Sequence, residues 1–233
     1  MKKISHLIGL LAALFLLVSC GSASHTEPGF KLSSVAEYAY IQPLSYIFLF
    51  HVDGGSYNEE YSDYVAGRIN AHISAERYPF SEMIEADYAG KNEDAFQWML
   101  TLDSIKPAEA SRLRVPKSLI KLIEDSGHRY GVVIFSQGYV TTKEAYGQQI
   151  AKKAATRLLD AAIESLTGVR GLTNLGGGYY LTSPYAHDMY LTVIDAQKAE
   201  VVYFNRQVPA DEKHPTDEGD VSKLLRKLLA DFR

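Results

Sequence analysis

The carboxyl-terminal part of the chain most constrains how the sequence can fold. Residues 189–208 read MYLTVIDAQKAEVVYFNRQV, so two apolar, β-rich runs flank the polar stretch Asp195–Glu200. This pattern predicts a β-hairpin. The following DVSKLLRKLLADF predicts an amphipathic helix, which must bury its apolar stripe and is expected to pack on a sheet face. The stripe consists of Val221, Leu224, Leu225, Leu228, Leu229 and Phe232.

The sequence between residues 37 and 142 predicts strands and helices in alternation. Tyr46–Val52 is a mostly apolar run closed by the turn residues DGG, which is typical of a strand. Ser56 and Glu59 have the spacing of a capping box and predict the start of a helix over 57–77. The elements expected next are a short strand in FSEMIEA, a helix in NEDAFQWMLTLDSI, a helix over 117–126 and a strand over 130–142.

A second capping box follows the strand over 130–142. Thr141 and Glu144 predict the start of a long helix, and a Gly- and Tyr-rich loop, GLTNLGGGYYLTSPYAH, comes after it. The prediction is therefore a single α/β domain over 37–233. Its mixed sheet carries helices packed on it, residues 141–187 form a helix and loop insertion, and the C-terminal β-hairpin is followed by an amphipathic helix.

Residues 1–19 are expected to be a targeting segment. Lys2 and Lys3 precede the apolar run Leu7–Val18, which is shorter than the roughly 20 residues that a transmembrane helix needs. Residues 17–20, LVSC, resemble the lipobox of bacterial lipoproteins. This resemblance implies that 1–19 are a lipoprotein signal peptide and that Cys20 becomes the lipidated first residue, carrying fatty-acyl chains such as palmitate. The alternative is an ordinary secretory signal peptide.

The resemblance to bacterial lipoproteins also implies a location. Gly21, and not Asp, follows Cys20, which by the sorting rule of enteric lipoproteins implies an anchor in the outer membrane, facing the periplasm. Residues 20–36 are small, polar and without periodicity, so we expect a flexible tether between the lipid and the domain.

Charge and cysteine content exclude several classes of protein. Removing Lys2 and Lys3 with the signal peptide would change the formal net charge from −4 to −6. With no basic cluster along the chain, nucleic acid is not an expected partner. Cys20 is the only cysteine, so no intramolecular disulfide can form. The fold must depend on its core, for which 46% hydrophobic residues and 16 Tyr are ample.

Three stretches resemble a known group of envelope proteins. They are YIFLFHVDGGSYNEEYSDYVAGRI, GHRYGVVIFSQG, and LTVIDAQKAEVVYFNRQV followed by VSKLLRKLLADF. In pattern they resemble the α/β domain shared by the curli-secretion lipoproteins, the amino-terminal domain of TolB and the penicillin-binding-protein activator lipoproteins. Asp195 matches the Asp that ends the first hairpin strand in that group. A curli channel has amphipathic barrel strands where residues 141–187 predict a helix and loop, which argues against a pore.

Some residues could carry catalysis, but a structural role explains them more simply. His51 and Asp53 follow the first predicted strand, where α/β proteins often place active-site residues, yet a strand-ending turn accounts for both equally well. Ser136 in FSQG lacks the Gly-x-Ser-x-Gly context of a nucleophile elbow, and no His or Asp stands at a telling spacing. We therefore predict no catalytic residues.

Metal and cofactor motifs are missing from the sequence as well. His187, Asp188 and His214 could ligate a metal, but no two histidines have the spacing that would direct their nitrogens to one ion. The glycines of LGGGYY lack the Gly-Lys-Ser/Thr of a P-loop. We predict no metal, no cofactor and no small-molecule substrate.

The expected function is a non-catalytic, lipid-anchored envelope protein that binds and assists another envelope protein or assembly. The alternatives are an accessory subunit of an outer-membrane export channel and a periplasmic hydrolase with an unrecognised site. Basic residues on the long helix and tyrosines in the loop are the hypothesised partner-binding surface. These residues are Lys152, Lys153, Arg157, Tyr179, Tyr180 and Tyr185.

Overall fold

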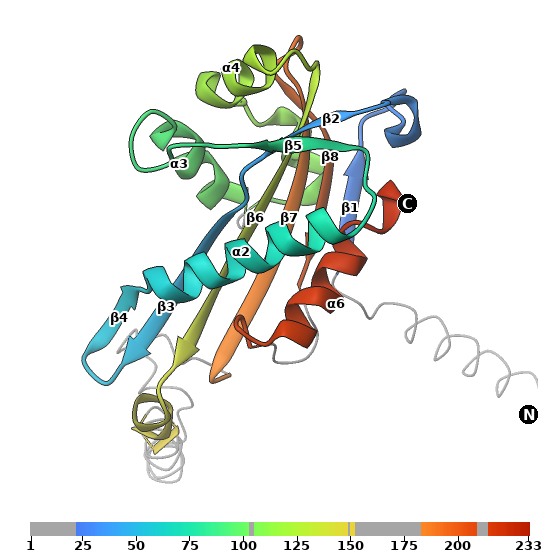
Figure 1. The fold of residues 1–233 in the computed structure, drawn as a ribbon. Helices are drawn as coiled ribbons and strands as arrows, with labels where there is room; N and C mark the ends of the chain where they lie inside the picture. The colour runs from blue at the N-terminus through green and yellow to red at the C-terminus, as the bar shows by residue number, and fades with distance from the viewer. Residues whose placement is uncertain (1–21, 103–104, 149, 152–182, 209–213) are drawn as a thin grey trace, which may run out of the picture.

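A computed structural model describes residues 22–102, 105–148, 150–151, 183–208 and 214–233 of the chain. These residues form one mixed β-sheet with helices packed on both of its faces (Figure 1). The predicted α/β class, the C-terminal hairpin and the helix that follows it are confirmed.

Strand β6 is the centre of the sheet. The strand order is β1-β8-β7-β6-β2-β5, and β3 also pairs with β6 and carries β4 on its other side. Strands β2 and β3 run parallel to β6 and occupy successive levels along it, whereas β7 is antiparallel to it. The strands span Ser22–Thr26 (β1), Tyr38–Ile41 (β2), Leu44–His51 (β3), Gly54–Tyr57 (β4), Phe80–Ile84 (β5), Tyr130–Thr141 (β6), Tyr185–Asp195 (β7) and Glu200–Gln207 (β8).

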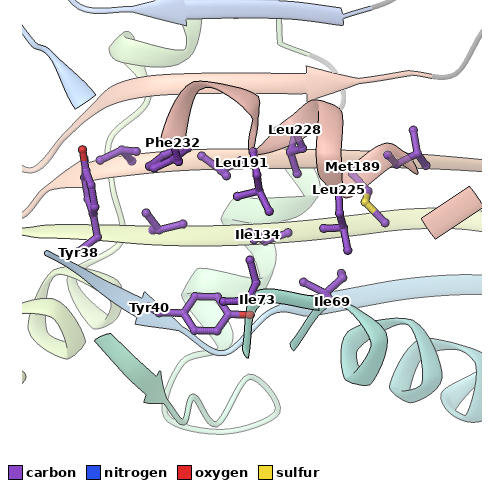
Figure 2. Close-up of a cluster of buried hydrophobic side chains, with 14 of the residues drawn as sticks. Tyr38, Tyr40, Ile69, Ile73, Ile134, Met189, Leu191, Leu225, Leu228 and Phe232 are labelled. Carbon is purple, nitrogen blue, oxygen red and sulfur yellow. The ribbon is translucent and has the colours of Figure 1, made fainter. Parts of the chain in front are cut away.

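Two helices cover each face of the sheet. Helices α2 (Glu59–Ala75) and α6 (Glu218–Leu228) cover one face, where their aliphatic side chains join residues such as Ile134 in a shared core (Figure 2). Helices α3 (Glu93–Thr101) and α4 (Lys117–Asp125) pack on the other face. In Figure 1, α3 and α4 lie at one end of the long strands, so they cover only part of that face.

The closing helix packs as its pattern predicts. All six residues of its apolar stripe are buried against the sheet and α2. The Asp217 carboxylate accepts a hydrogen bond from the Asp220 backbone N–H and so caps the first turn of α6. At the other end, Asn205 in β8 donates to the Leu228 carbonyl at 2.9 Å. Hydrogen bonds therefore fix both ends of α6 in place.

Both predicted capping boxes are wrong by one or two residues. The Asn58 side chain, and not Ser56, accepts from the Tyr61 backbone N–H at 2.8 Å, because Ser56 lies in β4, where it pairs with Leu49. Likewise Thr142, and not Thr141, accepts from the Ala145 N–H at the start of the helical residues 143–148. Strand pairing extends further than the sequence suggests and shifts each cap along the chain.

The prediction of a flexible tether is wrong from residue 22 onward. Strand β1 pairs antiparallel with β8, with Ser22 opposite Gln207. A 3₁₀ turn follows at Leu32–Ser34, and the Leu32 carbonyl accepts a hydrogen bond from the buried Tyr38 hydroxyl at 2.7 Å. The folded domain thus includes residues expected to lie outside it, since small polar side chains suit an edge strand as well as a linker.

Candidate functional site: an aromatic face on the sheet

Several residues of interest lie outside the described part of the chain. They are the lipidation candidate Cys20 and the partner-binding candidates Lys152, Lys153, Arg157, Tyr179 and Tyr180. Tyr185 is described, but it begins β7 instead of lying in a loop. Its ring centroid lies 5.0 Å from that of His214, and the side chain is half-buried.

Within the described part of the chain, no hydrogen bond or ion pair joins the His51 or Asp53 side chain to another side chain. Both are exposed at the turn between β3 and β4, where His51 pairs with Gly54. Their position at this turn accounts for His51 and Asp53 without a catalytic role.

Ser136 has a histidine partner that the sequence analysis missed. Its Oγ lies 2.7 Å from Nε2 of His187, and both side chains are buried. Strands β6 and β7 pair Ser136 with Met189 and Gly138 with His187, so the two side chains are diagonal neighbours on one face. Residues 51 positions apart meet only through this strand register, which no short sequence motif encodes.

The Ser136–His187 pair does not have the properties of a hydrolytic site. Burial, with a smaller contribution from the nearby His214, lowers the pKa of His187 to about 3, so its imidazole is neutral near pH 7. Within the described residues, Nδ1 of His187 has no hydrogen-bond partner, so no carboxylate orients the ring. Because Ser136 is fully buried, a substrate has no access to its hydroxyl.

The three candidate metal ligands also point apart. Nδ1 of His214 lies 2.9 Å from the Thr216 hydroxyl, and His187 contacts Ser136. Asp188 follows His187 in β7 and therefore faces the opposite side of the sheet, where it pairs with Arg206. In the described ranges, no three His, Cys, Asp or Glu side chains converge on one point.

An aromatic surface forms where α3 stops covering the sheet. We call it the aromatic face. Alternate residues of β3 point to this side, and β4 and β6 place tyrosines opposite Phe48 on the same side. Neighbouring ring centroids lie 5.0–6.2 Å apart, which is the usual range for aromatic pairs. The aromatic face consists of Tyr46, Phe48, Phe50, Tyr57 and Tyr139.

A pocket of about 410 Å³ opens on the aromatic face. Helix α3 bounds it, since Leu100 lines the pocket and the Phe96 ring lies 5.3 Å from Tyr46. Apart from Leu100, its lining comes from the strands: Tyr46, Phe48, Gln137, Gly138, Tyr139, Ala186, His187 and Asp188. The three aromatic residues in this lining, Tyr46, Phe48 and Tyr139, are half-buried.

Polar side chains form one edge of this pocket. The Gln137 amide donates to the Tyr190 hydroxyl at 3.0 Å, and that hydroxyl lies 3.4 Å from the Asp188 carboxylate. Arg206 pairs with the same carboxylate at 3.3 Å and lies over the Tyr190 ring. Aromatic rings beside an arginine are common at the centre of protein interfaces.

The described residues form a mixed α/β domain with an aromatic surface beside a pocket. No known protein family matches the chain, and no curated protein matches it. Among the described residues, no helix has the length and hydrophobicity needed to cross a membrane.

Remote structural neighbours exist among solved proteins. PelC from Paraburkholderia phytofirmans, solved as a dodecamer, is 9% identical, with a TM-score of 0.39 over 92% of this chain and 97% of PelC. A point variant of that dodecamer is 7% identical, with a TM-score of 0.41 over 92% and 98% of the two chains. A DUF4136 family protein from Bacteroides thetaiotaomicron is 9% identical, with a TM-score of 0.32 over 90% and 93%. Likeness at this level does not bear on function, and the resemblance to the curli-secretion, TolB and activator group stays a prediction.

Proposed function

We propose that this protein is a non-catalytic lipoprotein of the bacterial envelope that binds another envelope protein through the aromatic face. The observation that carries the proposal is the position of Phe48 and Tyr139, two half-buried rings beside a pocket at the end of α3. Aromatic side chains supply a large contact area at little cost in conformational entropy. The lipobox-like sequence that ends at Cys20 supports the location.

The polar edge of the pocket supports a protein as the partner. Arg206 and Asp188 are both partly buried, so a partner that covers the pocket would remove little further water from them. Their existing pairing lowers the desolvation penalty that a newly buried charge would carry. The pocket lining also includes Gln137, whose side-chain amide can donate to and accept from a partner backbone.

Site-specific photo-crosslinking in cells tests the binding face. A photoreactive phenylalanine at Phe48 should crosslink to one envelope protein, whereas the same group at the exposed Met83 in β5 should not. The double substitution F48A and Y139A should abolish capture of that partner and leave the structure folded by circular dichroism. Equal crosslinking from both positions, or full capture by the folded double variant, would contradict the proposal.

Intact-mass analysis tests the anchor separately. The protein isolated from membranes should begin at Cys20 and carry acyl mass on that residue. The variant C20A should fold but leave the membrane or accumulate unprocessed. A mature protein without acyl mass would end the lipoprotein part of the proposal, whatever the crosslinking shows.

A further inference from the structure

Another pocket lies where the end of helix α2 meets strand β5, and we call it the α2–β5 pocket. Residues 76–79 connect the two elements, as the turn of the chain in Figure 1 shows. Its volume of about 380 Å³ suits a small molecule, and it shares no lining residue with the pocket on the aromatic face. Its lining includes Tyr40, Ser74, Glu76, Tyr78, Phe80 and Glu82.

Tyr40 brings an unpaired polar group to the α2–β5 pocket. The residue is only 2% exposed, and within the described residues its hydroxyl has no hydrogen-bond partner. Its ring points from β2 toward Ile73 of α2, which also lines the pocket (Figure 2). Burial raises the pKa of Tyr40 above its ordinary value, so the hydroxyl stays neutral. A buried hydroxyl without a partner is unfavourable, which indicates that a bound molecule completes this site.

The lining of the α2–β5 pocket is negatively charged. Glu76 and Glu82 contribute carboxylates, and no Lys, Arg or His belongs to the described lining. Arg233 pairs with Glu76 at 3.6 Å, whereas Glu82 forms no ion pair within the described ranges. Helix α2 ends here, and the partial negative charge of a helix C-terminus lies in its last turn, where Ser74 lines the pocket. The pocket therefore favours a cation.

Three aromatic rings in the lining favour an organic cation over a metal ion. Tyr40 and Tyr78 both stack with Phe80, at centroid distances of 5.8 and 5.5 Å. Aromatic rings attract an ammonium group and also contact the aliphatic stem that carries it. A metal ion would need several ligands that converge on one point, and the described side chains include no group of three His, Cys, Asp or Glu that does so.

Ser81 holds the two groups that a cation would contact close to each other. Its Oγ accepts a hydrogen bond from the Tyr40 backbone N–H at 3.1 Å and donates to the Glu82 carbonyl at 2.8 Å. The pairing of β2 with β5 shifts register at this point, so the Ser81 side chain bridges the irregularity. Tyr40 and Glu82 are thereby fixed on neighbouring strands beside the same pocket.

We propose that the α2–β5 pocket binds a small primary amine, which is an ammonium group on a short aliphatic stem. The ammonium donates to the Tyr40 hydroxyl oxygen and to the Glu82 carboxylate, and the stem lies against the Phe80 ring. An ammonium group carries three donors and no acceptor, which matches an acidic pocket with an unpaired hydroxyl oxygen. This site is separate from the aromatic face and depends neither on the partner nor on the lipid anchor proposed above.

Ligand-detected NMR with pentylamine tests the site. Titration of the full-length protein at pH 7 should show saturable binding with a Kd of about 1 mM or lower, as expected for a ligand of this size. Pentan-1-ol has the same stem without the charge and should bind about tenfold more weakly. Equal binding of the amine and the alcohol, or no saturable binding of pentylamine, would overturn the proposal.

The variants Y40F and E82Q test the two contacts. Y40F should weaken pentylamine binding about fivefold or more, because it removes only the hydroxyl. E82Q should weaken binding about two- to fivefold, whereas E85Q removes an exposed carboxylate outside the lining and should have no effect. Full binding by folded Y40F, or equal binding by E82Q and E85Q, would overturn the assignment.

Stability without amine separates a binding role of Tyr40 from a structural one. Because its hydroxyl has no partner within the described residues, Y40F should be at least as stable as the wild type in urea unfolding. Pentylamine should then raise the stability of the wild type more than that of Y40F. A marked loss of stability in amine-free Y40F would show that the protein itself satisfies the hydroxyl, which would contradict the proposal.

Discussion

Ser136 Oγ and His187 Nε2 lie 2.7 Å apart across the β6–β7 pairing, and neither side chain reaches solvent. The contact joins two central strands on the face that α2 and α6 cover. Because this site cannot hydrate an imidazolium ion, the protein is folded with His187 neutral.

Acid should therefore destabilise the protein through His187. Its pKa is about 3 in the folded chain, below the ordinary value of 6.5 in the unfolded chain, so the unfolded state takes up the proton first. The stabilising contribution is complete above pH 6.5 and is lost as the pH falls from 6.5 toward 3. Between pH 7 and pH 5 the free energy of unfolding should drop by about 2 kcal/mol more than in H187Q.

Urea unfolding of both proteins at pH 7, 6 and 5 measures this difference. His72 and His214 also have a pKa lowered by burial, but they titrate in both proteins and their effects cancel in the comparison. Parallel curves for wild type and H187Q over this range would show that His187 takes up its proton without cost.

Leu225→Asp or Leu228→Asp should unfold or strongly destabilise the domain. Both side chains are fully buried between α6 and the sheet (Figure 2). A buried, unpaired carboxylate at either position, together with the lost apolar contacts, should lower the free energy of unfolding by about 3–5 kcal/mol. The exposed Lys227 on the same helix provides the control, since K227A should change stability by less than about 0.5 kcal/mol. Thermal melting that does not distinguish the three variants would contradict the docking of α6.

Gly138→Ala should destabilise the pairing of β6 with β7. A methyl group at Gly138 would lie 2.3 Å from the backbone carbonyl oxygen of Ala186, which cannot move without disturbing the strand ladder. We expect a loss of about 1–3 kcal/mol. Gly67 in α2 has open space around the same position, so G67A should instead stabilise the helix by about 0.5–1 kcal/mol. Denaturant melts of both variants check the opposite signs; a neutral G138A would show that the strands separate easily.

Arg129 and Asp195 should show strong energetic coupling. The buried Asp195 carboxylate accepts hydrogen bonds from two guanidinium nitrogens of Arg129, from Nη2 at 2.7 Å and from Nε at 3.2 and 3.3 Å. It also accepts the Gln197 N–H at the start of the β7–β8 turn. The single variant R129M should be less stable than the double variant R129M/D195N, because it leaves a buried carboxylate without its partner. A double-mutant cycle at low and high salt measures the coupling. Strict additivity would show that Arg129 is only a surface residue.

The apolar periodicity of the closing helix predicts its structure correctly. The spacing of Leu224, Leu225 and Leu228 predicts both the helix and its buried side, because an apolar stripe of that width is unfavourable when it is exposed to water. The predicted helix caps are wrong because Ser56 and Thr141 fit a capping pattern by their sequence spacing alone. In the structure, their backbone groups take part in strand pairing instead. Local chemistry cannot reveal which hydrogen-bonding partner a distant segment will offer.

The candidate site depended on information that the sequence does not contain. Phe48 and Tyr139 form one surface because β3 is parallel to β6 in one register. A shift of one residue would place their rings on opposite faces. Ser136 and His187 escaped notice for the same reason. The single cysteine and the apolar run before it, by contrast, predict an anchor without any knowledge of the fold.

The pairing of β1 with β8 also affects the order in which the chain can fold. Strand β1 comes first of the described strands, yet its only partner among them is the last one, so its hydrogen bonds cannot form until nearly the whole chain has been synthesised. Such a distant pairing forms slowly. Until then the outer edge of β8 lacks its neighbour, and an unpaired edge readily recruits other strands. A newly synthesised chain thus passes through a limited period in which this edge can pair with another chain.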